Sequence, residues 1–180
     1  MRILREESVL VLIDVQERLF PHIYNHEPLA QNIEVLLKGS TELKIPVILS
    51  EQYKKGLGET LFSLKQCFEP IHSIEKISFS CLGNASFYDF LAKANKKHVI
   101  LVGIESHICV LQTAIDLKAN NYEPIVVIDA VSSRKELDKI IAIERLIQEG
   151  VILTTCESLL FEWCRKAGTD EFKAISKLVK

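Results

Sequence analysis

The sequence has few features of a disulfide-stabilised or membrane-bound protein. Its five cysteines are an odd number and form no C-x-x-C pair, so neither a disulfide framework nor a zinc knuckle is expected. The apolar run before Asp14 is too short to cross a membrane, and no small-residue cleavage site follows it. We therefore expect a reducing compartment, with the cytoplasm as the default, and no membrane partner.

Basic charge and phosphate-binding motifs are also scarce. The net charge is −2 and the lysines and arginines are scattered, which argues against a nucleic-acid partner. No G-x-G-x-x-G follows an apolar run and no G-K-[ST] occurs, so a nucleotide-binding domain is disfavoured. Internal repeats, low-complexity tracts and Pro/Gly-rich linkers are absent, which predicts one domain over residues 1–180.

The chain does contain a regular alternation of short apolar runs and longer amphipathic stretches. Buried strands are expected at residues 8–14, 45–51, 98–105, 124–130 and 150–155, with a weaker strand at 71–76. Helical spacing of apolar residues marks the stretches 33–43, 85–95, 108–119 and 137–147. This alternation predicts a parallel sheet that is covered by helices on both faces.

In such a sheet, ligands bind beyond the carboxyl ends of the strands. The polar residues at the expected strand ends are Asp14, Glu51, Gln52, Lys76, Glu105, Ser106 and Asp129. Cys109 follows at the start of the next helical stretch. We expect the functional site at this edge, with Asp129 as a structural residue that caps nearby backbone.

Cys109 is the candidate nucleophile. With Ser106 as the expected N-cap, Cys109 falls in the first helical turn, where the helix dipole lowers a thiol pKa below its ordinary value of about 8.5. Free backbone amides there can also bind an oxyanion. Asp14 would supply the base and Lys76 the cation. The alternative is that Cys109 is only a buried packing residue, that Asp14 is a cap or turn residue, and that Lys76 is a solvated surface charge.

Five segments carry a family resemblance. They are LIDVQERLFP (12–21), SEQYKKGLGET (50–60), EKISFSC (75–81), GIESHICVLQTAIDL (103–117) and VIDAVSSR (127–134). In this order and spacing they resemble the isochorismatase-like cysteine hydrolase superfamily, in particular its branch of isochorismatase domain-containing proteins. The resemblance extends over essentially the whole chain and implies a three-layer α/β/α sandwich around a six-stranded parallel sheet.

The resemblance also implies a mechanism. Its catalytic triad would be Asp14, Lys76 and Cys109, with a cis peptide between Ile104 and Glu105 and an oxyanion site made of the backbone amides of Glu105 and Cys109. Asp14 would take the thiol proton and Lys76 would stabilise the thiolate. Cys109 would attack a small amide or ester, and water would hydrolyse the resulting thioester acyl-enzyme.

The implied substrate pocket consists of Phe20, Gln52, Tyr53, Phe79, His107 and Ile108, although Glu105 and His107 could instead face solvent or a subunit interface. The nicotinamidase branch binds a metal through an aspartate and histidines after the second strand. Residues 50–58 contain neither residue type, so no metal and no cofactor are expected. A small-molecule substrate and a homo-oligomer, dimer or larger, are the expected partners. The apolar stretch 159–163 is a candidate contact surface, with core packing as an equal alternative.

Two alternatives come from other functional classes. The first is a catalytically vestigial domain that acts as a binding or assembly module; the presence of Asp14, Lys76 and Cys109 argues against it. The second is a phosphoacceptor receiver domain. It requires an acidic pair after the first strand and an aspartate ending the third, whereas LIDVQ holds one acid and residues 71–80 hold only Glu75. Packing is the expected role of the other four cysteines, although Cys81 could approach the site.

Overall fold

The computed structural model covers residues 1–180 and contains one six-stranded sheet in the order β3-β2-β1-β4-β5-β6. The strands are β1 (Ser8–Ile13), β2 (Val47–Gln52), β3 (His72–Lys76), β4 (His98–Ile104), β5 (Glu123–Ser132) and β6 (Ile152–Thr154). All neighbouring strands are parallel. The expected parallel sheet and its six strands are confirmed, with shifts of a few residues at the strand ends.

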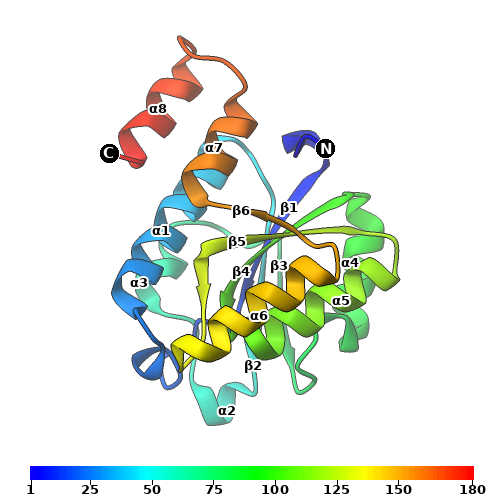
Figure 1. The fold of residues 1–180 in the computed structure, drawn as a ribbon. Helices are drawn as coiled ribbons and strands as arrows, with labels where there is room; N and C mark the ends of the chain where they lie inside the picture. The colour runs from blue at the N-terminus through cyan, green and yellow to red at the C-terminus, as the bar shows by residue number, and fades with distance from the viewer.

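Helices cover both faces of this sheet (Figure 1). One face is covered by α1 (His26–Glu42), α7 (Cys156–Cys164) and α8 (Asp170–Leu178), and the other by α4 (Ala85–Ala94), α5 (Leu111–Ala119) and α6 (Glu136–Gln148). The short helices α2 (Lys54–Leu57) and α3 (Phe62–Lys65) follow β2, and a π-helical turn, η4 (Ser106–Val110), precedes α5. Three 3₁₀ turns lie at Arg5–Glu7, Phe20–His22 and Cys81–Gly83. No helix is long and apolar enough to span a bilayer.

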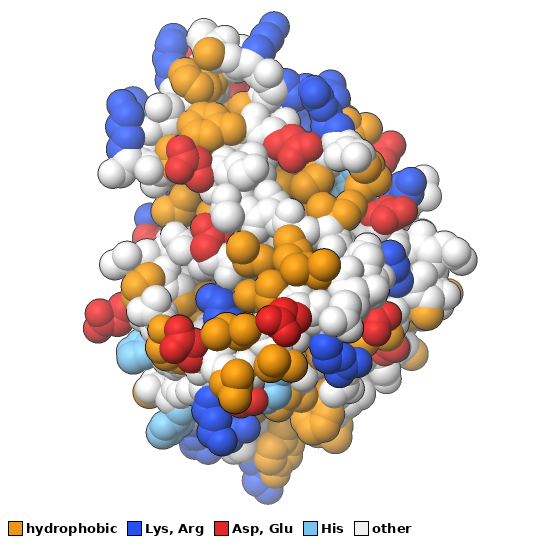
Figure 2. Space-filling model, viewed as in Figure 1, with side chains coloured by type: hydrophobic (Ala, Val, Ile, Leu, Met, Phe, Trp, Pro, Cys, Tyr) orange, Lys and Arg blue, Asp and Glu red, His pale blue; other side chains and the backbone are white.

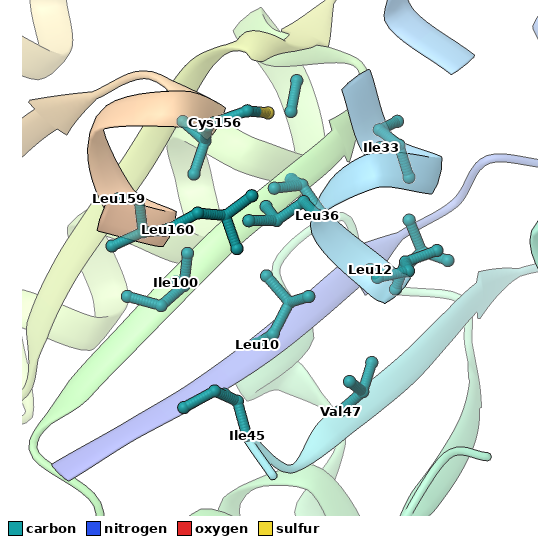
Figure 3. Packing of buried hydrophobic residues seen from close by; sticks show 14 of the residues in the cluster. Leu10, Leu12, Ile33, Leu36, Ile45, Val47, Ile100, Cys156, Leu159 and Leu160 are labelled. Atoms are coloured by element: carbon teal, nitrogen blue, oxygen red, sulfur yellow. The ribbon is translucent and has the colours of Figure 1, made fainter. Parts of the chain in front are cut away.

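The central strand β1 is buried on both faces, as its continuous apolar run predicts. Leu10 and Leu12 pack with α1 and α7, while Val9, Val11 and Ile13 pack with α4 and α5 on the opposite face. Figure 3 shows Leu10 and Leu12 directed toward the helical layer of the first face. Full burial of one such side chain stabilises the fold by about 1.5–3 kcal/mol, so these two layers hold the end of β1 firmly in place.

The apolar stretch 159–163 belongs to the first of these cores. Leu159, Leu160 and Trp163 are buried, and Leu160 packs so closely on α1 that a Cβ at Gly39 would overlap its side chain. Figure 3 shows Leu159 and Leu160 directed into the cluster. Core packing within one chain therefore accounts for this stretch, which does not form an open contact surface.

Candidate active site

The carboxyl ends of β1 and β3 meet the turn η4 and bring Asp14, Lys76 and Cys109 into one buried cluster. The ammonium nitrogen of Lys76 donates to Asp14 Oδ2 at 2.6 Å and lies 3.7 Å from Cys109 Sγ. The three residues are 1%, 2% and 6% exposed. The structure thus places side by side the three residues that the sequence nominated.

Two further polar side chains hold Asp14 and Lys76 in position. Ser50 Oγ, at the end of β2, donates to Asp14 Oδ1 at 3.0 Å. Gln52 Oε1 accepts a hydrogen bond from the Lys76 ammonium at 2.8 Å, and Gln52 Nε2 donates to the Ile77 carbonyl at 2.7 Å. Sequence reasoning missed Ser50, because a hydroxyl inside a buried strand has no pattern that separates it from a packing residue.

The D-x-Q spacing has a structural explanation. Gln16 is fully buried; its Oε1 accepts from the Gln52 backbone N–H at 2.8 Å, and its Nε2 donates to the Gln52 carbonyl at 3.0 Å. Its Nε2 also donates to the Gly58 carbonyl at 2.6 Å. Gln16 therefore joins the end of β1 to the end of β2, which fixes Gln52 relative to Asp14.

Close packing of β4 against β1 also positions Asp14. Gly103 in β4 has a φ of +114°, and a Cβ at this position would overlap the carbonyl oxygen of Ile13. Asp14 itself has a φ of 55°, in the left-handed region that non-glycine residues seldom occupy and that is enriched at functional sites. The chain turns sharply at the residue that bears the candidate base.

Burial and charge together set the protonation states of the cluster. Burial acts to lower the pKa of Lys76, but the charge of the Asp14 carboxylate and its hydrogen bond act in the opposite direction; the pKa is raised and the ammonium is retained. Burial raises the pKa of Asp14, and Lys76 opposes this shift. A carboxylate with a raised pKa is a better base near neutral pH.

The pKa of the Cys109 thiol is raised, which corrects the expectation from its place near a helix start. Burial is the largest cause and the negative charge of Asp14 the next, while Lys76 acts in the opposite direction. The resting thiol is therefore neutral and needs a base when it reacts. The shift is opposite to the one expected because burial of the sulfur beside a carboxylate outweighs the effect of the helix start.

The expected N-cap at Ser106 is also wrong. The Ser106 hydroxyl is buried and has no hydrogen-bond partner, and the turn follows Glu105 without a side-chain cap. The Glu105 carbonyl instead accepts from the N–H groups of Ile108 at 3.1 Å and Val110 at 3.2 Å. This wider turn satisfies its first amides through the backbone, so a serine cap is not needed.

The backbone N–H of Glu105 has no partner within the chain, whereas its side chain is hydrogen-bonded to Arg134. The Ile104–Glu105 peptide is cis, as expected, and the Glu105 N–H donates to no other group of the chain. The buried Glu105 side chain accepts from the Arg134 backbone N–H at 2.9 Å and from Arg134 Nε at 3.2 Å. Glu105 therefore faces neither solvent nor a partner, and Arg134 is a neighbour that sequence reasoning did not identify.

A pocket of about 210 Å³ opens onto this cluster. It is lined by Asp14, Leu19, Gln52, Leu57, Phe79, Glu105, Ile108, Cys109 and Arg134. A larger hollow of about 700 Å³ lies beside Cys67 and contains none of these residues. Of these two, the smaller pocket is the one that reaches Cys109.

Of the six residues expected to line the pocket, Gln52, Phe79 and Ile108 do so. The other three lie elsewhere: Phe20 is buried in the core, Tyr53 is 47% exposed, and His107 is hydrogen-bonded to Ser133 Oγ at 2.9 Å. Leu19, which precedes Phe20 in the chain, lines the pocket in its place, because successive side chains at a tight turn point in different directions.

Asp129 has a structural role, and the structure contains no cluster of potential metal ligands. Asp129 Oδ1 accepts from the Cys156 N–H at 2.9 Å, so it caps the start of α7 rather than the amides of its own segment. Nowhere do three or more His, Cys, Asp or Glu side chains gather closely enough to hold a metal ion.

Comparison with known proteins places the chain in a family. Residues 8–158 match the family model of the isochorismatase domain. The "Isochorismatase domain-containing protein 2" of Danio rerio is 38% identical over 178 residues, covering 99% of this chain and 89% of the relative. The structure of "MAR1 Ribonuclease" from Caenorhabditis elegans superposes with a TM-score of 0.93 at 36% identity, covering 99% of this chain and 92% of that one.

The Escherichia coli YcaC gene product, described as an octameric hydrolase of unknown specificity, has the same fold. It superposes with a TM-score of 0.93 at 22% identity and covers 99% of this chain and 89% of its own. A family match over most of the sequence and a relative aligned over nearly its full length lead to one conclusion: this chain belongs to the isochorismatase family.

Proposed function

We propose that this chain is a cysteine-dependent hydrolase that cleaves a small amide or ester through a thioester acyl-enzyme. One contact carries the proposal: the Lys76 ammonium lies 2.6 Å from Asp14 Oδ2 and 3.7 Å from Cys109 Sγ, and Asp14 and Cys109 line a pocket. A carboxylate, a cation and a thiol in contact are the parts that nucleophilic catalysis by cysteine requires. Membership of a family of hydrolases supports the same reaction class.

In the first step Asp14 takes the proton of the neutral Cys109 thiol as the sulfur attacks the substrate carbonyl carbon. A C–S bond forms and the carbonyl electron pair moves to oxygen. The free N–H of Glu105, together with the N–H of Cys109, would donate to this oxyanion. Lys76 balances the negative charge that moves from Asp14 to the sulfur and then to the intermediate.

In the second step the tetrahedral intermediate collapses. The C–N bond of an amide, or the C–O bond of an ester, breaks, and protonated Asp14 returns its proton to the leaving group. Water then attacks the thioester with Asp14 again as the base. The thiolate of Cys109 leaves, recovers the proton from Asp14 and releases a carboxylic acid.

The pocket limits the substrate to a small molecule with one apolar and one polar end. Leu19, Leu57, Phe79 and Ile108 supply apolar surface within about 210 Å³. Arg134 binds Glu105 through its backbone N–H and Nε, which leaves the terminal guanidinium nitrogens free for a hydrogen-bond acceptor on the substrate. We expect a short acyl group with an acceptor atom at the end remote from the bond cleaved.

The name of the Caenorhabditis elegans relative raises RNA cleavage as a competing activity. Binding of RNA phosphates depends on lysines and arginines along a groove. This chain carries a net charge of −2, and the one arginine at the pocket is paired with Glu105. Amide or ester hydrolysis is therefore favoured over phosphodiester cleavage.

The reaction needs no metal or cofactor, because Asp14, Lys76 and Cys109 supply each step. A homo-oligomer is expected, an assembly that the octameric Escherichia coli protein of the same fold illustrates. The cytoplasm remains the expected compartment, since all five cysteines are free thiols.

An acyl-trapping screen tests the activity. Wild type and Cys109→Ala are incubated with small amides and activated esters such as p-nitrophenyl acetate, and with a labelled RNA. The expected result is turnover by wild type and a mass increase of one acyl group on Cys109, with neither in Cys109→Ala. No adduct and no turnover with any substrate would favour a vestigial module, and RNA cleavage that persists in Cys109→Ala would favour a nuclease.

A further inference from the structure

His107 lies outside the pocket, but its ring joins two of the segments that form the pocket. Its Nδ1 is hydrogen-bonded to Ser133 Oγ at 2.9 Å, and its Nε2 lies 3.9 Å from Asp138 Oδ2. His107 belongs to the turn η4, two residues before Cys109, and Ser133 directly precedes Arg134 after the end of β5. The imidazole therefore links the segment that bears the candidate nucleophile to the segment that bears the arginine of the pocket.

Helix α6 supplies the carboxylate of this contact from its inward side. The expected helix is confirmed, but its apolar stripe faces outward, and Figure 2 shows apolar side chains gathered on the face of the molecule where α6 lies in Figure 1. Ala142 and Leu146 are the buried residues of α6. Asp138 shares their side of the helix, because residues four apart lie on one face. The orientation of α6 thus turns Asp138 toward η4.

The position of Asp138 determines which ring nitrogen accepts a hydrogen bond. A carboxylate beside Nε2 favours the tautomer with its hydrogen on that nitrogen, which leaves Nδ1 to accept from the Ser133 hydroxyl. Ser133 is 0% exposed, so water cannot replace the imidazole as its partner. Loss of the acceptor would leave a buried donor unsatisfied, which is costly.

A second contact joins the same two segments. The Glu105 side chain, two residues before His107, accepts from the Arg134 backbone N–H at 2.9 Å and from Arg134 Nε at 3.2 Å. The Tyr24 N–H also donates to the Ser133 carbonyl at 2.9 Å. The backbone that leads into Arg134 is therefore held by two other segments of the chain, and His107 provides its side-chain link to η4.

We propose that His107 is a positioning residue: through Ser133 it keeps Arg134 in a fixed place relative to Cys109. The spacing between the sulfur and the guanidinium then selects acyl groups by their length. This inference rests on the proposed function, because it assigns Cys109 and Arg134 to the two ends of one substrate. His107 itself does not line the pocket and touches neither substrate nor reacting atoms.

A pair of thiol reagents measures the placement of Arg134 without any turnover. N-iodoacetylglycine and N-methyliodoacetamide both alkylate Cys109 with loss of iodide, and only the first carries a carboxylate remote from the reacting carbon. The ratio of the two rates, divided by the same ratio for N-acetylcysteine, does not depend on the ionisation of the thiol. Arg134 should favour the carboxylate reagent in wild type, and Arg134→Met should lower the ratio by about threefold or more.

Variants of the link should have the same effect as loss of the arginine. His107→Leu and Ser133→Ala should each lower the ratio by about threefold. His107→Asn places an amide oxygen where Nδ1 lies and should recover most of the ratio, whereas His107→Gln places it nearer Nε2 and should not. Ser86→Ala is the matched control: it removes a His–Ser hydrogen bond of the same length, 2.9 Å to His72 Nε2, and should leave the ratio unchanged.

The double variant Ser133→Ala/Arg134→Met separates positioning from an independent effect. It should have the ratio of Arg134→Met alone, since the serine acts through the arginine. A further loss in the double variant, a wild-type ratio in Arg134→Met, or wild-type ratios in both His107→Leu and Ser133→Ala would overturn the proposal.

Thermal unfolding of each variant checks that the fold is intact. If Ser133→Ala does not fold, the two amide variants of His107 decide, and equal ratios in both would overturn the proposal. The alkylation requires no catalysis. An inactive wild type in the substrate screen, with these changes in the ratio still present, would therefore reject the hydrolase and leave the placement of Arg134 by His107 established.

Discussion

The Ser50 hydroxyl donates to Asp14 Oδ1 at 3.0 Å, while the Lys76 ammonium holds Oδ2 of the same carboxylate at 2.6 Å. The candidate base is thus bound on one oxygen by a neutral donor and on the other by a cation. Both bonds favour the charged carboxylate, and both lower the pKa of Asp14 against the larger effect of burial. Burial and Lys76 have the larger effects on the affinity of the base for a proton, and the Ser50 hydroxyl adds a smaller one.

Ser50→Ala should raise the pKa of Asp14 further. A hydrogen bond to a charged group contributes about 1.5–3 kcal/mol, and one pKa unit corresponds to about 1.4 kcal/mol. We expect the acid limb of the pH–rate profile, measured with a substrate from the screen, to move up by about one pH unit. Ser50→Thr keeps the hydroxyl and should restore the wild-type limb; an unchanged limb in Ser50→Ala would contradict the role.

The alkylation rate of Cys109 should follow the raised pKa of its thiol. With iodoacetamide and peptide mass spectrometry, the rate should lie below that of N-acetylcysteine at pH 7–8 and still be rising above pH 9, because the thiolate is the reactive form. This measurement needs no substrate and therefore stands apart from the activity screen.

Variants of the two neighbours should move that profile in opposite directions. Asp14→Asn removes a negative charge that raises the pKa of Cys109, so the profile should move to lower pH although hydrolysis is lost. Lys76→Met removes a charge that lowers this pKa, so the profile should move to higher pH. Shifts of the same sign in both variants would show that charge does not control this thiol.

Arg134→Met should affect substrate binding more than the chemical step. It removes the Nε hydrogen bond to Glu105 and the free guanidinium nitrogens at the pocket, so KM should rise about tenfold or more with a smaller change in kcat. Arg134→Lys keeps the charge without the planar fork and should recover only part of the loss. Equal losses in kcat and kcat/KM would instead point to a role in the transition state.

Gly103→Ala should destabilise the fold by at least about 2 kcal/mol, because the new Cβ meets the Ile13 carbonyl at a positive φ. Gly168→Ala is the matched control: its φ is +87° but nothing lies within 4 Å of the added Cβ. The control should cost only about 1 kcal/mol in left-handed strain. Urea unfolding of both variants measures the difference, and equal losses would remove the case for close packing at Gly103.

The sequence by itself determined the strands, the parallel sheet and the edge at which the site lies. Continuous apolar runs can be buried only between two layers, and parallel strands bring their carboxyl ends to one edge. Asp14, Lys76 and Cys109 could therefore be nominated together from strand ends and family motifs alone.

Tertiary structure decided what each of these side chains faces. Periodicity reports which residues share a side of an element but not what lies against that side, so the outward stripe of α6 and the pocket position of Leu19 could not be anticipated. The sign of the Cys109 pKa shift also depended on long-range neighbours, since burial and the Asp14 carboxylate outweigh the helix start. Contacts between residues far apart in the chain, such as Ser50 with Asp14 and Arg134 with Glu105, exist only once the strands have aligned.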